Sequence, residues 1–340
     1  MPVGYRHVDV FATGPYTGNS LAVFGADGDL PDGDLPGGDP SGGDPRRDPT
    51  AGQLLAITQE VRHFESVFLA PPDAAGVVPA RVFDLFGELD FAGHPVLGAA
   101  AVLHERAGGA GPRRWTFRLP GATVGVTTTP SEAGFTALLD QGPPRFLGEV
   151  PAADRPAIAA ALSLPAGVLA GLPLEVVSTG LAYLIVPVTS GLPGAGIAHP
   201  GFGALLARYG ARFAYLLDLG AYGGTEGRGG TRQGRDRPLE GRSWNNDGVL
   251  EDVATGSAAG CVGAYLARHG LVPPDAEFTL AQGRFAGRPS LMRVTPQGPR
   301  DALVNVRVGG EVAFVAAGRL DRLPPPAEGS GAGPVRRRIR

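Results

Sequence analysis

Two similar stretches of the chain each place one polar residue at the expected start of a helix of small residues. Glu88–Leu103 and Glu251–Leu266 align without a gap, and in each an acidic residue ends an apolar run. The polar residue that follows is His94 in the first stretch and Ser257 in the second. The start of a helix gathers free N–H groups and the positive end of the helix dipole. Two such starts facing a shared cleft are suited to hold a carboxylate or an enolate.

Each polar residue near these helix starts has a chemical and a structural interpretation. His94 either polarises a substrate oxygen or passes a proton, or else it pairs with a backbone carbonyl. Asp252 either contacts substrate or fastens the turn through nearby N–H groups. Ser257 either contacts substrate or caps the helix. Gly93 and Gly256 let the backbone come close to a ligand.

A second repeat extends the duplication beyond the helix starts. Thr13-Gly14 and Thr179-Gly180 each separate two expected strands, and they occur in the same order as the first pair of similar stretches. Repeats in the same order indicate duplication of a whole lobe. A chain of 340 residues also has enough length for two cores of about 150 residues each.

The apolar patterns predict helices alternating with groups of short strands. The helices are expected at 53–61, 95–105, 154–162, 201–209 and 258–269. The last two strands are expected at 302–308 and 312–317, on either side of a Gly-Gly pair.

These elements divide into an N-terminal lobe, 1–145, and a C-terminal lobe, 146–323. The segment 25–52 repeats Gly, Asp and Pro with almost no large apolar residue, so it is expected to be a flexible loop. A solvated insertion is favoured over a substrate lid for this segment. The basic end, 324–340, is expected to be a disordered tail.

The composition excludes several kinds of chemistry. The single cysteine, Cys261, cannot form an intrachain disulfide. All 30 basic residues are Arg, so no lysine is present to form a Schiff base. The six histidines show no metal-ligand spacing, and no glycine-rich phosphate loop follows a clear strand. We therefore expect no metal and no cofactor.

Charge and hydropathy point to a small-molecule partner. A formal charge of −3 gives no field to recruit nucleic acid or a membrane surface. No run approaches the roughly 20 apolar residues of a membrane helix, and no secretion signal pattern begins the chain. The sequence thus predicts a cytoplasmic protein that acts on a small molecule.

A series of ordered motifs resembles a known family. The motifs are Asp9–Gly14 with Gly18-Asn19, Phe64–Phe68, Glu88–Pro95, Val177–Gly180, Glu251–Ala258, and Gln282-Gly283 with Gly287–Ser290. Together they resemble the phenazine biosynthesis PhzF-like proteins from about residue 5 to residue 320. The resemblance implies an α+β fold of the diaminopimelate epimerase type. In that fold two pseudo-symmetric lobes each wrap a curved, mainly antiparallel sheet around a central helix.

The resemblance also implies an active site between the lobes, with a glutamate that shuttles a proton. By motif that glutamate is Glu65, and it acts with His94, Asp252 and Ser257. The implied substrate contacts are Asn19, Ser20, Gly93, Thr255 and Gly256. The family further implies a homodimer.

Physical chemistry supports the role implied for Glu65. Moving a proton between two carbons needs a base whose conjugate acid can return it, and an apolar cleft raises a carboxyl pKa toward working pH. Glu65 lies between Phe64 and Phe68 on an otherwise apolar strand. The alternative is a glutamate at the edge of the strand that points to water.

Several differences from related families bear on substrate and mechanism. Racemases of this fold use two thiols, and the equivalent positions here are His94 and Ser257, so two-thiol racemisation is excluded. Cys261 is expected to be a small buried hydrophobe. The motif positions Ser20, Val253 and Ser243–Asn246 depart from the PhzF-like pattern, so the phenazine precursor is not assigned as the substrate.

The sequence predicts a cofactor-independent isomerase that moves a proton or a double bond within a small anionic metabolite, in secondary metabolism. One alternative uses the same Glu65 for a cyclisation or for loss of water. The other alternative is a non-catalytic protein that binds a ligand on the same fold.

Overall fold

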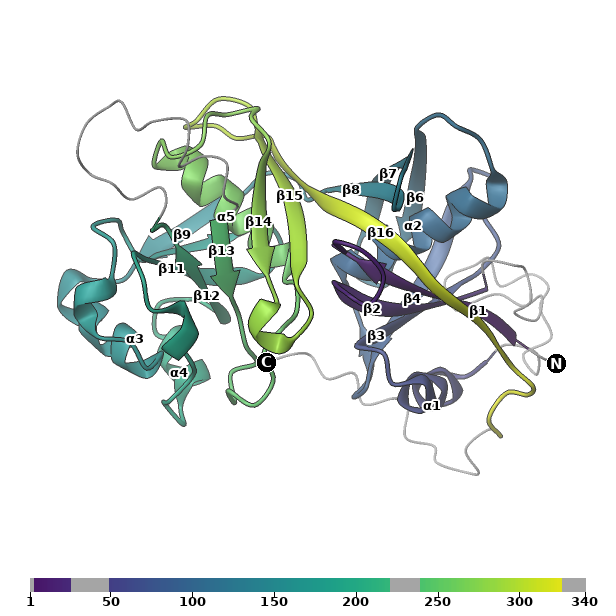
Figure 1. Ribbon diagram of the computed structural model, residues 1–340, viewed down its shortest axis with the longest axis horizontal. Coiled ribbons are helices and arrows are strands. Elements are labelled where there is room, and N and C mark those ends of the chain that lie inside the picture. The colour runs from purple at the N-terminus through teal and green to yellow at the C-terminus, as the bar shows by residue number, and fades with distance from the viewer. Residues whose placement is uncertain (1–2, 26–48, 221–238, 326–340) are drawn as a thin grey trace. The chain divides into compact units, whose positions relative to one another are not determined.

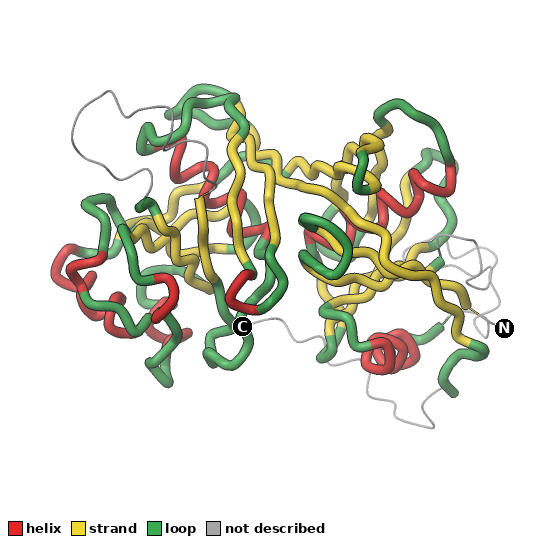
Figure 2. Tube along the Cα trace, viewed as in Figure 1, coloured by secondary structure: helices red, strands yellow, loops and turns green. Residues whose placement is uncertain are grey.

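The fold is seen in a computed structural model, which describes residues 3–25, 49–220 and 239–325. The chain divides into two compact units (Figure 1). The N-terminal unit combines residues 1–139 with 310–340, and the C-terminal unit is 140–309. Most of the expected loop 25–52 and of the expected tail 324–340 lies outside the described residues. Strands make up most of the regular structure in each unit (Figure 2).

The N-terminal unit is a ring of strands. Its strands are β1 (Val3–Val10), β2 (Asn19–Phe24), β3 (Glu65–Leu69), β4 (Val77–Asp84), β5 (Glu88–Leu89), β6 (Arg113–Arg118), β7 (Thr123–Ser131), β8 (Gly134–Asp140) and the second part of β16 (Asn305–Leu320). The sheet order is β1-β2-β3-β4-β6-β7-β8-β16, and β16 pairs again with β1. The ring is therefore closed, and its edge strands are paired.

Helix α2 (Gly93–Ala107) packs against the inner face of this ring. Its small residues allow a close approach, since a side chain at Gly98 would collide with Leu21 and crowd Val8 and Val10. Helix α1 (Ala51–Val61) covers the outer face (Figure 1). Leu54 and other apolar side chains form a core there with Phe24. The sheet is thus covered by helix on both faces.

The C-terminal unit repeats this arrangement, with the same succession of antiparallel and parallel pairings from β10 to β15 as from β1 to β7. Its strands are β9 (Arg145–Glu149), β10 (Glu175–Ser178), β11 (Ala182–Val188), β12 (Phe213–Asp218), β13 (Leu239–Arg242), β14 (Phe278–Gln282), β15 (Ser290–Gln297) and the first part of β16. The sheet order is β16-β15-β14-β13-β12-β11-β10-β9. Helix α5 (Gly256–Arg268) packs against β10, β11 and β15. Gly263 permits this contact, because a side chain there would meet Val294 at 2.6 Å.

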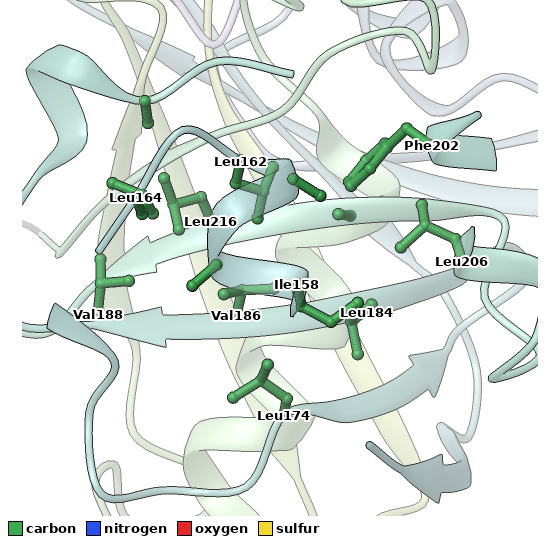
Figure 3. Close-up of a cluster of buried hydrophobic side chains, with 14 of the residues drawn as sticks. Ile158, Leu162, Leu164, Leu174, Leu184, Val186, Val188, Phe202, Leu206 and Leu216 are labelled. Carbon is green, nitrogen blue, oxygen red and sulfur yellow. The ribbon is translucent and has the colours of Figure 1, made fainter. Parts of the chain in front are cut away.

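Two short helices cover the outer face of the second sheet. They are α3 (Arg155–Ala161) and α4 (Phe202–Ala207). Ile158 and Phe202 from these helices pack with Leu184, Val186 and Leu216 of the strands (Figure 3). Strand β11 is therefore buried on both faces, which explains its continuous apolar sequence.

The structure confirms the expected fold class: each unit is a curved, mainly antiparallel sheet with a central helix. The strands expected at 302–308 and 312–317 are, however, one strand, β16. Its residues Asn305–Gly309 pair with β15, and those from Val312 onward pair with β1. The Gly-Gly pair between them marks a change of partner rather than a turn. As a result the described residues from Gly310 to Pro325 belong to the N-terminal unit, whereas the sequence-based division placed residues up to 323 with the C-terminal lobe.

Strands β9 and β13 were not expected from the sequence. Both are short, and β9 is largely exposed, so neither has a strong alternating pattern. Among the described residues, no helix has both the length and the apolarity needed to span a membrane.

Replacing Gly98 by Ala tests the close packing of α2. We expect Gly98→Ala to lower the free energy of unfolding by about 2 kcal/mol, because the new methyl group must displace Leu21. Gly52→Ala in α1 is the control, since its nearest neighbour would be Thr50 Oγ1 at 3.9 Å. That change should be neutral or stabilise by less than about 1 kcal/mol. Urea unfolding followed by circular dichroism measures both, and equal effects would contradict the packing argument.

Candidate active site

Glu65 is the first residue of β3 and faces the inside of the N-terminal ring. It pairs in register with Leu21 of β2, and Leu21 approaches Gly98 of α2. Residues in register on neighbouring strands share a face of the sheet, so the Glu65 side chain lies on the inner face. The side chain is 19% exposed.

His94 is the second residue of α2 and lies beside Glu65. Its Nδ1 is 3.7 Å from Glu65 Oε2, which is too long for a hydrogen bond. Burial lowers the pKa of His94 to about 3. The imidazole is therefore neutral at physiological pH, and the contact is between a neutral ring and a carboxyl group rather than an ion pair. Among the described residues, no group hydrogen-bonds to the buried His94 Nε2.

The start of α2 lacks a side-chain cap. Its N-cap residue is Ala92, whose side chain cannot accept a hydrogen bond from the first N–H groups. By contrast, α1 begins with a complete capping box formed by Thr50 and Gln53. A side chain at Gly93 would make only an ordinary contact of 3.6 Å with Leu139, so the protein itself leaves this position open.

Asn19 and Ser20 lie on opposite faces of β2. Asn19 shares the inner face with Leu21 by strand alternation and is buried. Ser20 is on the other face, where its hydroxyl lies 3.3 Å from His63 Nδ1. The structure thus places Asn19 on the side of Glu65, and it places Ser20 with a histidine that the motif analysis did not select.

His63 belongs to a small polar cluster on that outer face. Its ring centroid is 4.2 Å from that of His7, and His7 Nε2 is 3.6 Å from Asp9 Oδ1. Asp9 also accepts a hydrogen bond from the Tyr16 N–H. No sequence spacing signals this cluster, because β1, β2 and the end of α1 contribute to it separately.

In the C-terminal unit, Asp252 and Thr255 hold the turn that precedes α5. Thr255 Oγ1 donates to Asp252 Oδ2 at 2.8 Å, and the Ala254 N–H donates to Asp252 Oδ1. Gln282 Nε2 donates to Thr255 Oγ1 and to the Asp252 carbonyl. Asp252 therefore makes the turn-fastening contacts that were one of its two interpretations. Burial raises the pKa of its carboxyl group, and the bond from Thr255 partly offsets this rise.

Ser257 contacts a tyrosine rather than capping its helix. Its Oγ is 2.8 Å from the hydroxyl of Tyr183, and no side chain caps α5. Burial raises the pKa of Tyr183, so the phenol keeps its proton and remains a hydrogen-bond donor. The helix start is also held by Gln141, which donates to the Gly256 carbonyl and accepts a hydrogen bond from Thr179. Tyr183, Gln141 and Gln282 were not assigned roles from the sequence.

A buried arginine holds the acidic residue of each repeated stretch. Arg81 Nε and Nη2 donate to the two oxygens of Glu88, both at 2.7 Å. Arg242 Nε and Nη2 donate to the two oxygens of Glu251 at 2.9 and 2.6 Å. Each guanidinium also lies over an aromatic ring two residues further along the chain, Phe83 or Trp244. The repeated Arg-x-aromatic pattern is the sequence signal that would have revealed these pairs.

The thiol of Cys261 lies 3.7 Å from Thr179 Oγ1, which also donates to the Ser257 carbonyl. Cys261 is buried, and burial raises the pKa of its thiol to about 11, so it is not a thiolate at physiological pH. Within the described part of the chain, no three His, Cys, Asp or Glu side chains come together in a way that could hold a metal ion.

Comparison with known proteins places these residues in a family context. The family of phenazine biosynthesis-like proteins matches residues 8–318. A trans-2,3-dihydro-3-hydroxyanthranilate isomerase from Pseudomonas aeruginosa is 30% identical over 325 residues, which is 93% of this chain and 98% of that relative. A solved structure from Pseudomonas aeruginosa, described as a predicted epimerase, is 40% identical with a TM-score of 0.74 and covers 94% of this chain and 99% of its own.

A more distant structure shares the fold alone. It is a probable proline racemase from Agrobacterium radiobacter K84, 13% identical with a TM-score of 0.54, and it covers 94% of this chain and 92% of its own. The epimerase-like fold expected from the sequence is thereby confirmed.

Burial of neutral His94 should make the protein less stable in acid. The pKa falls from about 6.5 in the unfolded chain to about 3 in the folded one, so between these values the unfolded chain binds one more proton. The stability from the neutral ring is complete above pH 6.5 and is lost as the pH falls. From pH 7 to 5, wild type should lose about 2 kcal/mol more unfolding free energy than His94→Asn. Parallel pH dependence in urea titrations would contradict this.

The buried pair Arg242–Glu251 should stabilise the turn before α5. Its side chains are 8% and 13% exposed, so Glu251→Gln leaves a buried cation without its partner charge. We expect a loss of about 3 kcal/mol in unfolding free energy. Glu277→Gln is the matched control, because Arg293 and Glu277 pair with 41% and 42% exposure, and it should cost less than about 1 kcal/mol. Similar losses in the two variants would show that the buried pair has no special role.

Proposed function

This chain belongs to the phenazine biosynthesis-like family, and from that premise we propose that it moves a proton within a small anionic metabolite, with Glu65 as the acid and base. Relatives that match 93% and 85% of this chain are named isomerases, so the chain is an isomerase. The observation that carries the assignment of Glu65 is its position 3.7 Å from a buried, neutral His94 at an uncapped helix start.

The proposed chemistry follows from the properties of the two side chains. A single carboxyl group can remove a proton from one carbon and return it to another, because its conjugate acid stays in place. A neutral imidazole can donate a hydrogen bond from one ring nitrogen and accept one at the other. His94 is therefore suited to polarise a substrate oxygen while Glu65 carries the proton. The helix N–H groups favour the negative charge that develops on that oxygen.

We assign supporting roles in the same reaction to the C-terminal unit. Ser257 and the protonated Tyr183 share a hydrogen bond and offer hydroxyl donors to an anionic substrate. Asp252 acts mainly through the turn that it holds with Thr255. The sequence has one cysteine, and it is buried, which leaves the carboxyl group as the proton carrier in place of a pair of thiols.

The first substrate to test comes from the names of relatives. Trans-2,3-dihydro-3-hydroxyanthranilate is the compound for which the Pseudomonas aeruginosa relative is named. We propose that the substrate here is a small carboxylate of this general kind, acted on in secondary metabolism. Isomerisation and cyclisation conserve mass and loss of water does not, so mass spectrometry of the product distinguishes dehydration from the other two reactions.

Glu65→Gln tests the proposed function directly. Proton NMR in D2O should show wild type exchanging a carbon-bound proton or converting trans-2,3-dihydro-3-hydroxyanthranilate or a related carboxylate. Glu65→Gln should be slower by at least about 100-fold, because the amide cannot accept the proton. Glu60→Gln, an equal change at an exposed position of α1, should keep the wild-type rate. Turnover by Glu65→Gln at the wild-type rate would contradict the role proposed for Glu65.

A further inference from the structure

Arg212 lies just before β12 and has a partly buried guanidinium. Its Nε and Nη2 atoms are buried, and no described residue hydrogen-bonds to either. Burial lowers the pKa of Arg212, but a guanidinium remains charged at physiological pH. Buried charges in proteins are normally paired, since removing a charge from water is costly. Within the described residues, these two donor atoms of Arg212 therefore have no acceptor.

In the two buried arginines, Arg81 and Arg242, the acceptor is a carboxylate. In Arg81 and Arg242 the same two atoms, Nε and Nη2, bind the two oxygens of one carboxylate. This edge of the guanidinium is a planar pair of donors that matches the geometry of a carboxylate. In Arg212 the same edge is buried and has no bond to any residue in the described part of the chain.

A series of contacts connects Arg212 with the start of α5. Its guanidinium carbon is 5.1 Å from the centre of the Phe213 ring, and that ring is 5.6 Å from the ring of Tyr183. Tyr183 in turn bonds to Ser257. The strands agree with this order, because Tyr183 and Phe213 are in register on parallel strands and the Arg212 N–H bonds to the Ala182 carbonyl.

The charge of Arg212 also affects the pKa of Tyr183. Burial is the main cause of the raised pKa of Tyr183, and the nearby guanidinium partly offsets it. Asp252 raises the pKa of the same phenol. The phenol therefore keeps its proton and can donate a hydrogen bond to an anion.

We propose that the Nε and Nη2 edge of Arg212 binds a carboxylate group of the substrate, with Tyr183 and Ser257 as neighbouring hydroxyl donors. This inference rests on the proposed function, since it names a group that the substrate carries. It assigns specificity for a planar carboxylate over a neutral amide, which would leave the guanidinium charge unpaired. A tetrahedral phosphate matches the planar edge less well and is distinguished by the test.

Binding of benzoate to the full chain tests this site without knowledge of the substrate. Isothermal titration or NMR titration compares benzoate, benzamide and inorganic phosphate on wild type, Arg212→Gln, Arg212→Lys and Arg208→Gln. We expect wild type to bind benzoate at least 10-fold more tightly than benzamide or phosphate. Arg212→Gln should reduce benzoate to the level of benzamide, and Arg212→Lys should recover part of the loss because it keeps the charge without the paired donors.

The control separates a local site from net charge. Arg208 is exposed on the same unit, so Arg208→Gln removes an equal charge and should leave benzoate binding unchanged. Thermal unfolding checks that each variant folds, and Arg212→Lys serves if Arg212→Gln does not. Equal binding of benzoate and benzamide by wild type, tighter binding of phosphate, or full benzoate binding by both Arg212 variants would overturn the proposal.

Glu65→Gln distinguishes failure of this inference from failure of the proposed function. It should abolish proton exchange and leave benzoate binding intact. If wild type showed no exchange with any carboxylate while benzoate binding still required Arg212, the proposed function would fail and the carboxylate site would stand. If proton exchange required Glu65 but benzoate binding did not depend on Arg212, the proposed function would stand and the carboxylate site would fail.

Discussion

Each unit depends on the close contact between a helix of small residues and the sheet around it. Gly98 in α2 and Gly263 in α5 have neighbours from the strands in the space where a side chain would begin. A larger residue at either position would push the helix away from the sheet. Since each helix starts with a functional candidate, His94 or Ser257, this contact also fixes where those side chains lie. In both units, the packing of the helix against its sheet therefore also determines the position of the candidate residue at the helix start.

In both clusters, burial favours the uncharged form of a titratable side chain. It keeps the imidazole of His94 neutral and keeps the phenol of Tyr183 protonated. One bidentate pair of arginine and glutamate occurs in each unit, Arg81–Glu88 and Arg242–Glu251. A charge that develops on a substrate would be stabilised by hydrogen-bond donors and helix N–H groups.

The fold and much of the candidate site could be predicted because their signals are local. Small residues at helical spacing, Gly-His and Gly-Ser turns and a repeated order of motifs predicted two helices with polar starts, and the structure has both. The partner of Ser257 could not be predicted, because Tyr183 reaches it from β11 and the contact depends on tertiary packing. The Arg242–Glu251 pair, by contrast, had a sequence signal in the repeated Arg-x-aromatic pattern. The sequence did not single out Arg212. What marks this residue is that no described residue hydrogen-bonds to its Nε and Nη2 atoms, and this depends on the folded structure. The Gly-Gly pair in β16 shows the opposite problem, since a local turn signal was overruled by pairing on both sides.

The path of β16 bears on how the protein is made. The N-terminal unit begins at residue 1 but needs the strand from Gly310 to Leu320 to close its ring. The C-terminal unit lies wholly between these segments, so every one of its residues leaves the ribosome before that strand does. During synthesis the unit that starts first must therefore be completed last, and until then its strands β1 and β8 have open edges. Until β16 emerges, a nascent chain of this protein therefore carries an unfinished sheet whose open edges can pair with another chain.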